Sequence, residues 1–205
     1  MKKLLIGFLV LLAALGAGAG AYAGYALGMF DDPASNIAIG ADMPGFTMTD
    51  HTGEEHALSD YAGEIVVLNF ASHKCPFSRG VDPDLAEIAR EYADKGVVVL
   101  GIDSHYATPR EELAEYVAEE NIPWPLLKDE NHAYADQVGV KRTPEIFILD
   151  TEGALVYHGG FDGRRSTTGP GPEPYVDQAL AALVAGEPIE TKQTKAWGCT
   201  IKRDD

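Results

Sequence analysis

The sequence predicts an α/β protein with a central mixed β-sheet flanked by helices. Early in the chain, apolar strand-like runs alternate with amphipathic helical segments, a pattern typical of parallel strands joined by helices. Further on, residues 145–149 and 154–157 have the composition of strands and are separated by a turn at 150–153. The second pattern predicts an antiparallel hairpin, so the sheet is expected to contain both kinds of pairing.

The first half of the domain is expected to begin with an N-terminal β-hairpin at residues 46–58, where a glycine turn separates two short strand-like runs. Residues 64–70 follow as a buried strand of the parallel type, because nearly all of their side chains are apolar. A helix comes next, since apolar residues recur at helical spacing from Leu85, and it ends at Gly96. Residues 97–102 then form a second buried strand.

The second half is expected to open with a helix whose start, residues 108–111, has the pattern of a capping box. Residues 123–127 are predicted to be an edge strand, because their two prolines cannot donate to a ladder. Residues 131–138 are expected to form a short helix. After a loop rich in glycine and proline at 159–174, a final amphipathic helix is expected at 175–185.

Composition limits the possible partners. The chain has 205 residues, of which 45% are hydrophobic, and this suits one compact domain with a core. Its formal net charge of −16 makes nucleic acid and anionic membrane surfaces poor partners. The 2 cysteines are too few for a disulfide-stapled scaffold, and no zinc-finger spacing is present.

The N-terminus has the features of a targeting segment. Lys2 and Lys3 precede an uncharged apolar stretch at residues 4–30. A small-x-small pattern at 21–23 favours a cleaved signal peptide, whereas the length of the stretch favours a retained membrane anchor. Both alternatives for residues 1–30 place the remainder outside the cytoplasm, in the cell envelope or secreted, and leave this segment as the only contact with a membrane.

Three further parts are expected. Residues 31–42 are predicted to be a linker, residues 43–186 the folded domain, and residues 187–205 a C-terminal tail laid on the surface that carries Cys199. No internal repeat is found.

Cys75 is the first candidate for chemistry. It lies between a buried strand and the start of a helix, where unpaired N–H groups stabilise a thiolate. His73, Lys74 and Arg79 flank it and would lower its pKa further. The alternative is a buried, inert cysteine, a common role for this residue.

Two short motifs now suggest a family. The segment 75–78, Cys-Pro-Phe-Ser, stands at the start of the first helix. Pro83 follows Cys75 by eight residues and is expected to kink that helix. Thr143 and Pro144 precede the strand at 145–149. Together with the order of the elements, these residues resemble the thioredoxin-like superfamily, in the exported redoxin and peroxiredoxin-like branch related to AhpC and TSA proteins. A terminal Gly198-Cys199 is similar to a motif of single-cysteine members of that branch.

The resemblance implies a thioredoxin-like fold and a set of roles. Cys75 would be the nucleophile, and Ser78, in place of the usual second cysteine, would donate a hydrogen bond to its thiolate. The Thr143–Pro144 peptide bond would be cis, and the backbone of Thr143 would pair with a substrate strand. The implied catalytic residues are Cys75, Ser78 and Cys199, and the implied substrate-binding residues are Pro76, Phe77, Thr143 and Pro144. The implied partners are protein or small-molecule disulfides and thiols with an external reductant, and no cofactor or metal is expected.

Departures from the family pattern leave alternatives open. Asn69 occupies the place of the buried acid of thioredoxins, and Ser72 stands where a peroxidase would have threonine. The first hypothesis is a thiol–disulfide oxidoreductase in which Cys199 resolves Cys75. The second is an antioxidant peroxidase that oxidises Cys75 to sulfenic acid. The third is a copper carrier, in which His73 and Cys75 would bind the metal together with His105 or Cys199, or a redox-silent adaptor. Cys199 could equally be a free tail thiol or pair between chains, and the sequence does not choose.

Overall fold

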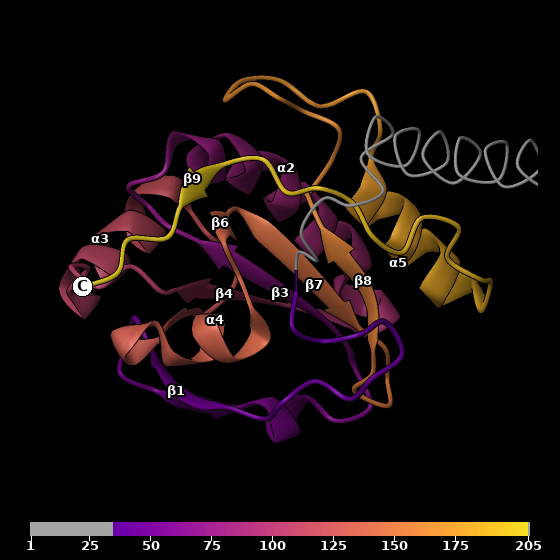
Figure 1. The fold of residues 1–205 in the computed structure, drawn as a ribbon, viewed down its shortest axis with the longest axis horizontal. Coiled ribbons are helices and arrows are strands. Elements are labelled where there is room, and N and C mark those ends of the chain that lie inside the picture. The colour runs from indigo at the N-terminus through magenta and orange to yellow at the C-terminus, as the bar shows by residue number, and fades with distance from the viewer. Residues whose placement is uncertain (1–34, 205) are drawn as a thin grey trace, which may run out of the picture. The chain divides into compact units, whose positions relative to one another are not determined.

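The computed structural model describes residues 35–204 (Figure 1). Their main sheet has seven strands in the order β2-β1-β5-β4-β3-β7-β8, with parallel and antiparallel pairs. The strands are β1 (Thr47–Asp50), β2 (Glu55–Ala57), β3 (Ile65–Ala71), β4 (Val97–Asp103), β5 (Leu126–Lys128), β7 (Glu145–Leu149) and β8 (Leu155–Gly159). The predicted mixed sheet, with its N-terminal hairpin, is confirmed.

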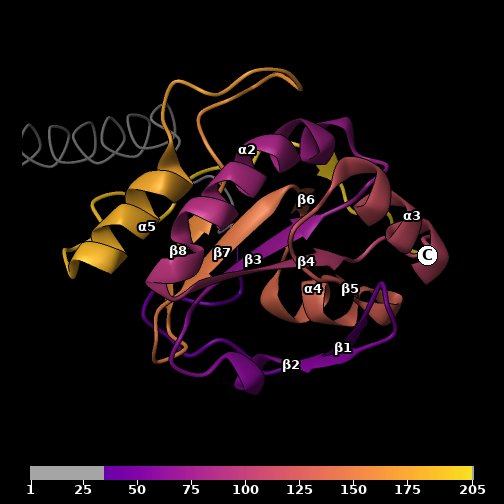
Figure 2. The same cartoon turned by 180° about the vertical axis from the view of Figure 1, so that it is seen from behind.

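Helices cover both faces of the sheet. They are α2 (Pro76–Tyr92), α3 (Arg110–Glu120), α4 (Ala133–Val138) and α5 (Tyr175–Ala185), with short 3₁₀ helices η1 (Leu58–Tyr61), η2 (Ala93–Lys95) and η3 (Glu130–His132). Helices α2, α3 and α5 cover one face (Figure 2) and α4 covers the other (Figure 1), and their apolar side chains belong to two separate core clusters. Among the described residues, no helix is long and apolar enough to cross a membrane. The expected signal or anchor at 1–30 lies outside the described residues.

Strand β3 is at the centre of the core. All seven of its residues are buried. Successive side chains point to opposite faces, so Val67 joins the core beneath α2 while Leu68 joins the core beneath α4. Because β3 has a strand on each side, its carboxyl end is held firmly where the chain turns toward Cys75.

Strand β5 corrects the predicted edge strand. It lies inside the sheet, parallel to β4 and antiparallel to β1. The two prolines do not prevent this, because the ladder begins at Leu126, after Pro125. Pro125 takes part only through its carbonyl oxygen, which accepts from Gly101 N–H at 3.0 Å.

Two predicted helix starts also differ from the structure. The capping box does not form: Pro109 is the N-cap of α3, and Thr108 Oγ1 has no hydrogen-bond partner among the described residues. The expected helix at 131–138 begins only at Ala133, because Asn131 and His132 adopt left-handed φ angles of 54° and 49°. The carboxylate of Asp129 accepts from the first N–H groups of α4.

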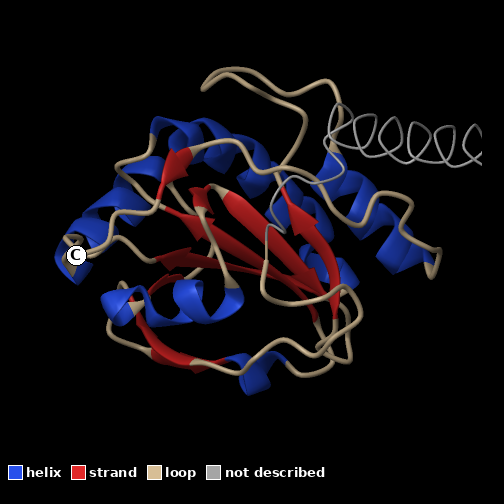
Figure 3. Ribbon diagram, in the orientation of Figure 1, coloured by secondary structure: helices blue, strands red, loops and turns tan. Residues whose placement is uncertain are grey.

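Both ends of the described chain lie on the domain. The described part of the expected linker, 35–42, is bonded to it through Asn36 N–H to Val138 and Gly40 N–H to Leu155. The tail after α5 crosses the surface (Figure 3) and includes β9 (Cys199–Thr200), which pairs antiparallel with β6 (Arg142–Thr143). The tail predicted on the surface is therefore attached by backbone hydrogen bonds.

Candidate active site

Cys75 occupies the N-cap position of α2, four residues after β3 ends at Ala71. Its backbone is extended, with φ −90° and ψ 118°, and Pro76 begins the helix with a ring that needs no hydrogen bond there. The backbone N–H of Cys75 donates to Ser72 at 2.9 Å, which fixes the turn. Cys75 is only 2% exposed. The expected place at the mouth of the helix is confirmed, and the thiol lies under other residues.

The tail brings Cys199 to Cys75. The Cys75 thiol donates to the carbonyl oxygen of Thr143 at 3.0 Å, and Thr143 is the partner of Cys199 in the β6–β9 ladder. The side chain of Cys199 lies close enough to lower the pKa of the Cys75 thiol, and both cysteines line one hollow. The Thr143–Pro144 bond is cis, as predicted. Two cysteines 124 positions apart (199 − 75) therefore meet at one strand pair.

The residue before Cys199 has to be small. A Cβ on Gly198 would lie 2.0 Å from the carbonyl oxygen and 2.6 Å from the carbonyl carbon of Thr143. Both atoms belong to the backbone and cannot move aside cheaply. Glycine therefore allows β9 to approach β6 closely enough for the sulfur atoms to meet.

The two thiols have opposite pKa shifts. Burial raises the pKa of Cys75, but donors from the Cys199 thiol, the Ser78 N–H, the Thr143 side chain and the Cys199 N–H outweigh it and bring the pKa below its ordinary value. Burial, the hydrogen bond to Cys75 and repulsion by its charge raise the pKa of Cys199 to about 11. The pair can therefore hold one thiolate, on Cys75, beside a protonated Cys199.

The flanking basic residues act differently from the prediction. Lys74 pairs with Glu112 at 2.8 Å, and His73 Nε2 lies 3.2 Å from the same carboxylate. Arg79 pairs with Glu120. Since these charges are neutralised by α3, hydrogen bonds rather than flanking positive charges lower the pKa of Cys75.

Ser78 reaches Cys75 through its backbone. Its backbone N–H lowers the pKa of Cys75 without forming an N-cap hydrogen bond to the Cys75 side chain, whereas its buried hydroxyl accepts from Ser72 N–H at 3.2 Å. Of the expected substrate-binding residues, Pro76 is exposed, and Phe77 and Pro144 line a hollow with Trp197 of the tail. Thr143 is already paired with β9. The tail therefore occupies the strand edge that the sequence predicted for a substrate.

A buried acid that the sequence reasoning missed lies on α2. Asp82 is 5% exposed, and burial raises its pKa to about 6, although the Tyr116 hydroxyl donates to it. It shares a small hollow with Asn69 and Asp103, each of which has a buried oxygen without a hydrogen-bond partner in the described chain. The available signal was its place on the apolar face of α2, one turn before Leu85.

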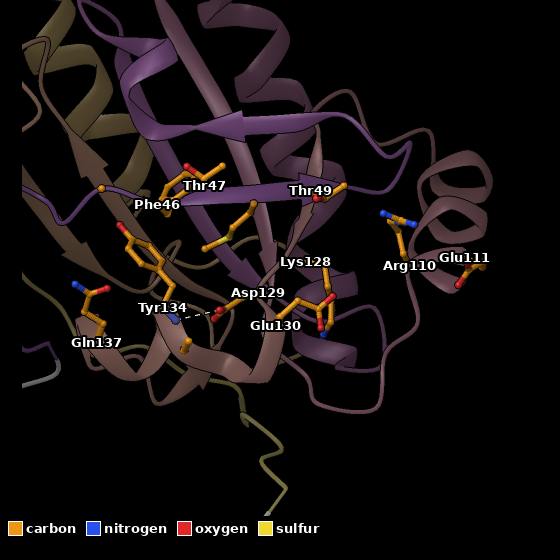
Figure 4. A pocket seen from close by; sticks show the side chains of 13 residues that line it. Phe46, Thr47, Thr49, Arg110, Glu111, Lys128, Asp129, Glu130, Tyr134 and Gln137 are labelled. Atoms are coloured by element: carbon orange, nitrogen blue, oxygen red, sulfur yellow. Dashed lines mark hydrogen bonds between the residues drawn. The ribbon is translucent and has the colours of Figure 1, made fainter.

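Other candidate sites contain neither cysteine. A cavity of about 550 Å³ lies between β1, α4 and the start of α3 (Figure 4), with Lys128, Glu130 and Tyr134 in its wall. Asp50, Glu54 and His56 form the group of potential metal-ligating side chains found among the described residues. One oxygen of Asp50 already accepts four hydrogen bonds from the hairpin turn, which accounts for that residue structurally.

Comparison with known proteins identifies the family. The model of the AhpC/TSA family matches residues 39–158, more than half of the chain. This chain belongs to the AhpC/TSA family. The thiol-disulfide oxidoreductase ResA of Geobacillus thermodenitrificans (strain NG80-2) is 30% identical to this chain over 147 residues, which cover 72% of this chain and 79% of ResA.

Solved structures agree with the AhpC/TSA assignment. An uncharacterized conserved protein from Geobacillus kaustophilus matches with a TM-score of 0.77 and 31% identity, over 83% of this chain and 95% of that one. Peroxidoxin BcpB from Mycobacterium tuberculosis matches with a TM-score of 0.59 and 25% identity, over 73% and 98%. The thioredoxin-like fold implied by the sequence motifs is confirmed.

Proposed function

We propose that this chain is an extracytoplasmic thiol–disulfide oxidoreductase in which Cys75 is the nucleophile and Cys199 the resolving thiol. The observation that carries the proposal is the place of Cys199 at the β6–β9 pair, opposite Thr143 and in the same hollow as Cys75. The name of the relative ResA supports the same reaction class. Cys75 is the better nucleophile of the two, because its pKa is lowered while the pKa of Cys199 is raised.

The reaction has two steps. The Cys75 thiolate attacks one sulfur of a substrate disulfide, whose bond breaks, and the departing substrate sulfur takes up a proton. Cys199 then loses its proton and attacks Cys75 Sγ, so that a Cys75–Cys199 disulfide forms and the second substrate thiol leaves. The substrate is reduced by two electrons and the protein is oxidised by two.

Substrate access requires the tail to undock. Strand β9 pairs with the backbone of Thr143, where a substrate strand would bind, and Cys75 is only 2% exposed. In the reduced protein only non-covalent contacts hold the tail. A substrate strand can therefore take the place of β9 on Thr143, present its disulfide to Cys75, and give way when the tail returns.

Two other functions receive less support. A peroxidase would need an arginine at the thiol, and none of the arginines at 35–204 is a hydrogen-bond partner of Cys75. Arg79 and Arg164 hold carboxylates instead. A copper site on Cys75 is not supported either, because the clustered ligand atoms found in the described chain belong to the β1–β2 hairpin.

The experiment is a reaction with a peptide disulfide. Wild-type reduced protein should release both substrate thiols, and peptide mapping should then find Cys75 joined to Cys199. Cys199→Ser should stop at a mixed disulfide on Cys75. Cys75→Ser should react at least about a hundredfold more slowly, because the nucleophile is lost. Equal rates for wild type and Cys75→Ser would contradict the proposal.

Export rests on the basic and apolar pattern of residues 1–30. Cell fractionation tests it together with N-terminal sequencing. Mature protein that begins near Gly24 would indicate a cleaved signal, and full-length protein that resists carbonate extraction would indicate an anchor. Full-length protein in the cytoplasmic fraction would contradict export.

A further inference from the structure

The two sulfur atoms differ in their access to a partner. Cys75 is 2% exposed, whereas Cys199 is half-buried and has exposed neighbours in Trp197 and Thr200. Once a Cys75–Cys199 disulfide has formed, the tail can no longer leave Thr143 freely, because a covalent bond ties it there. The route that a substrate uses in the reduced protein is therefore closed in the oxidised protein.

The surface around Cys199 is basic. Arg142 stands opposite Thr200 in the strand pair, and Lys202 follows Cys199 closely enough to lower the pKa of its thiol. Arg165 lies over the ring of Trp197, with 5.3 Å between its guanidinium carbon and the ring centre. Within the described chain, none of these three basic residues forms a salt bridge, unlike Lys74 and Arg79.

The same surface carries exposed aromatic rings. In the described part of the chain, the large hydrophobic side chains that are exposed are Tyr106, Val184 and Trp197, at 53%, 41% and 45%. Two of the three lie on or against the tail segment that carries Cys199: Trp197 precedes it by two positions, and Tyr106 N–H donates to the carbonyl of Lys202, three positions after it, at 3.2 Å. Tyrosine, tryptophan and arginine are enriched where proteins bind partners.

We propose that the external reductant of this chain is an acidic thiol protein that docks on this face, defined by Tyr106, Arg142, Arg165, Trp197 and Lys202, and attacks Cys199 rather than Cys75. The inference rests on the proposed function, since it starts from the Cys75–Cys199 disulfide. It adds which sulfur meets the reductant and what charge the reductant carries.

The exchange balances as follows. A thiolate of the reductant attacks Cys199 Sγ, the bond to Cys75 breaks, and Cys75 leaves with the electron pair. A second thiolate of the reductant then attacks its own sulfur in the mixed disulfide, and Cys199 leaves and takes up a proton. The reductant becomes a disulfide and the pair becomes two thiols. Burial of Cys75 and the low pKa of its thiol make it the natural leaving group.

An acidic partner is compatible with the net charge of −16. Charges beyond about 8 Å are screened at physiological ionic strength, so the basic residues of this face dominate the docked encounter. Lys202 also lines the same hollow as Cys199, and Arg142 stands opposite Thr200, so positive charge lies beside the reacting sulfur, which a lipid-binding surface has no reason to provide. These two points favour an acidic protein thiol over an anionic membrane.

The experiment uses oxidised full-length protein and two synthetic peptides with one cysteine each, flanked by aspartates in one and by lysines in the other. Each peptide's rate is normalised to its rate with neutral hydroxyethyl disulfide, which removes differences in thiol pKa. After quenching with N-ethylmaleimide, peptide mapping should find the peptide on Cys199 and the maleimide on Cys75. The acidic peptide should react about tenfold faster at low salt, and the preference should vanish at 1 M salt.

Lys202→Glu should reduce the preference about threefold or more. Lys95→Glu, which changes the net charge equally but lies in η2, beyond the C-terminal end of α2, should leave it unchanged. A mixed disulfide on Cys75, or equal rates for the two peptides, would overturn the inference while the starting disulfide remained intact. Binding of wild type but not Lys202→Glu to phosphatidylglycerol vesicles, without a peptide preference, would assign the face to lipid and also overturn it. Starting protein without the Cys75–Cys199 disulfide would overturn the proposed function itself.

Discussion

The two cysteines are held by the fold in contrasting ways. Cys75 follows β3, whose seven residues are all buried, and begins the 17-residue helix α2. Cys199 belongs to a two-residue strand at the end of a tail. The first is fixed by the core of the domain, and the second by a short ladder and a few side chains beyond it.

Because of this difference, the stability of the domain and the docking of the tail are expected to respond to different substitutions. Changes near Cys75 act on the packing of β3 and α2, so they are expected to alter stability. Changes in the tail are expected to alter the docking of β9 while the sheet remains intact, because local segments can detach without global unfolding.

Ile201→Ala should have the largest effect on docking. Ile201 is 5% exposed and packs in the core beneath α4 with Val138 and Val140. Its truncation should cost about 2 kcal/mol of docking free energy, or roughly thirtyfold in the population of undocked tail. The measurement is the alkylation rate of Cys199 in reduced protein. Val184→Ala, which truncates an exposed side chain, is the control. An unchanged rate with a lower melting temperature would show that the tail is not a separate unit.

Gly198→Ala tests the close approach of the two strands. The added methyl group would meet the Thr143 backbone at 2.0 Å, and such overpacking should cost about 1–3 kcal/mol. Formation of the Cys75–Cys199 disulfide should slow by about tenfold, measured by loss of free thiols under mild oxidation. At Gly45 a Cβ would have nothing within 4 Å, so Gly45→Ala is the matched control. A wild-type rate in Gly198→Ala would refute the described register.

Ser78→Ala should affect stability without affecting the thiolate. It leaves the buried Ser72 N–H without its acceptor, which should cost about 1–2 kcal/mol in chemical denaturation. The pKa of Cys75, followed by thiolate absorbance, should stay the same because the Ser78 backbone N–H remains. A clear rise in that pKa would restore the role that the sequence suggested for the hydroxyl.

His132→Gln should have the smallest and most pH-dependent effect. His132 holds Asp136 at 2.8 Å and Asp204 of the tail at 3.0 Å, and these carboxylates raise its pKa. Since the folded pKa is raised, the stabilisation is complete below the unfolded value near 6.5 and is lost as the pH rises through the folded value. At pH 5.5 the alkylation rate of Cys199 should be higher in the variant than in wild type, by a factor of less than about five. At high pH the two rates should be equal. An equal difference at both pH values would exclude a charge effect.

Local patterns predict the rigid half of the site. The apolar run of β3, the helical spacing from Leu85 and the position of Cys75 between them are properties of neighbouring residues. The family resemblance adds the cis Thr143–Pro144 bond. The interior place of β5 was missed because prolines in sequence do not reveal where a ladder begins.

Long-range pairs could not be read from the sequence. Glu112 and Glu120 of α3 neutralise Lys74 and Arg79, and only the packing of α3 beside α2 brings them together. The docking of Cys199 on Thr143 is of the same kind, because the tail has no local pattern that names its partner. The sequence indicated only a surface tail that carries Cys199, and it left the pairing of Cys199 with Cys75 as one of several alternatives.

Disulfide mapping of mildly oxidised wild-type protein shows whether Cys75 and Cys199 form a bond with each other. The protein should migrate as a monomer with no free thiol, and a single peptide pair should contain Cys75 and Cys199. Reduction should restore two thiols and lower the melting temperature, since closing so long a loop stabilises the fold by about 4–5 kcal/mol in the chain-entropy model. Two free thiols after oxidation, or a disulfide-linked dimer that disappears in Cys199→Ser, would contradict the account.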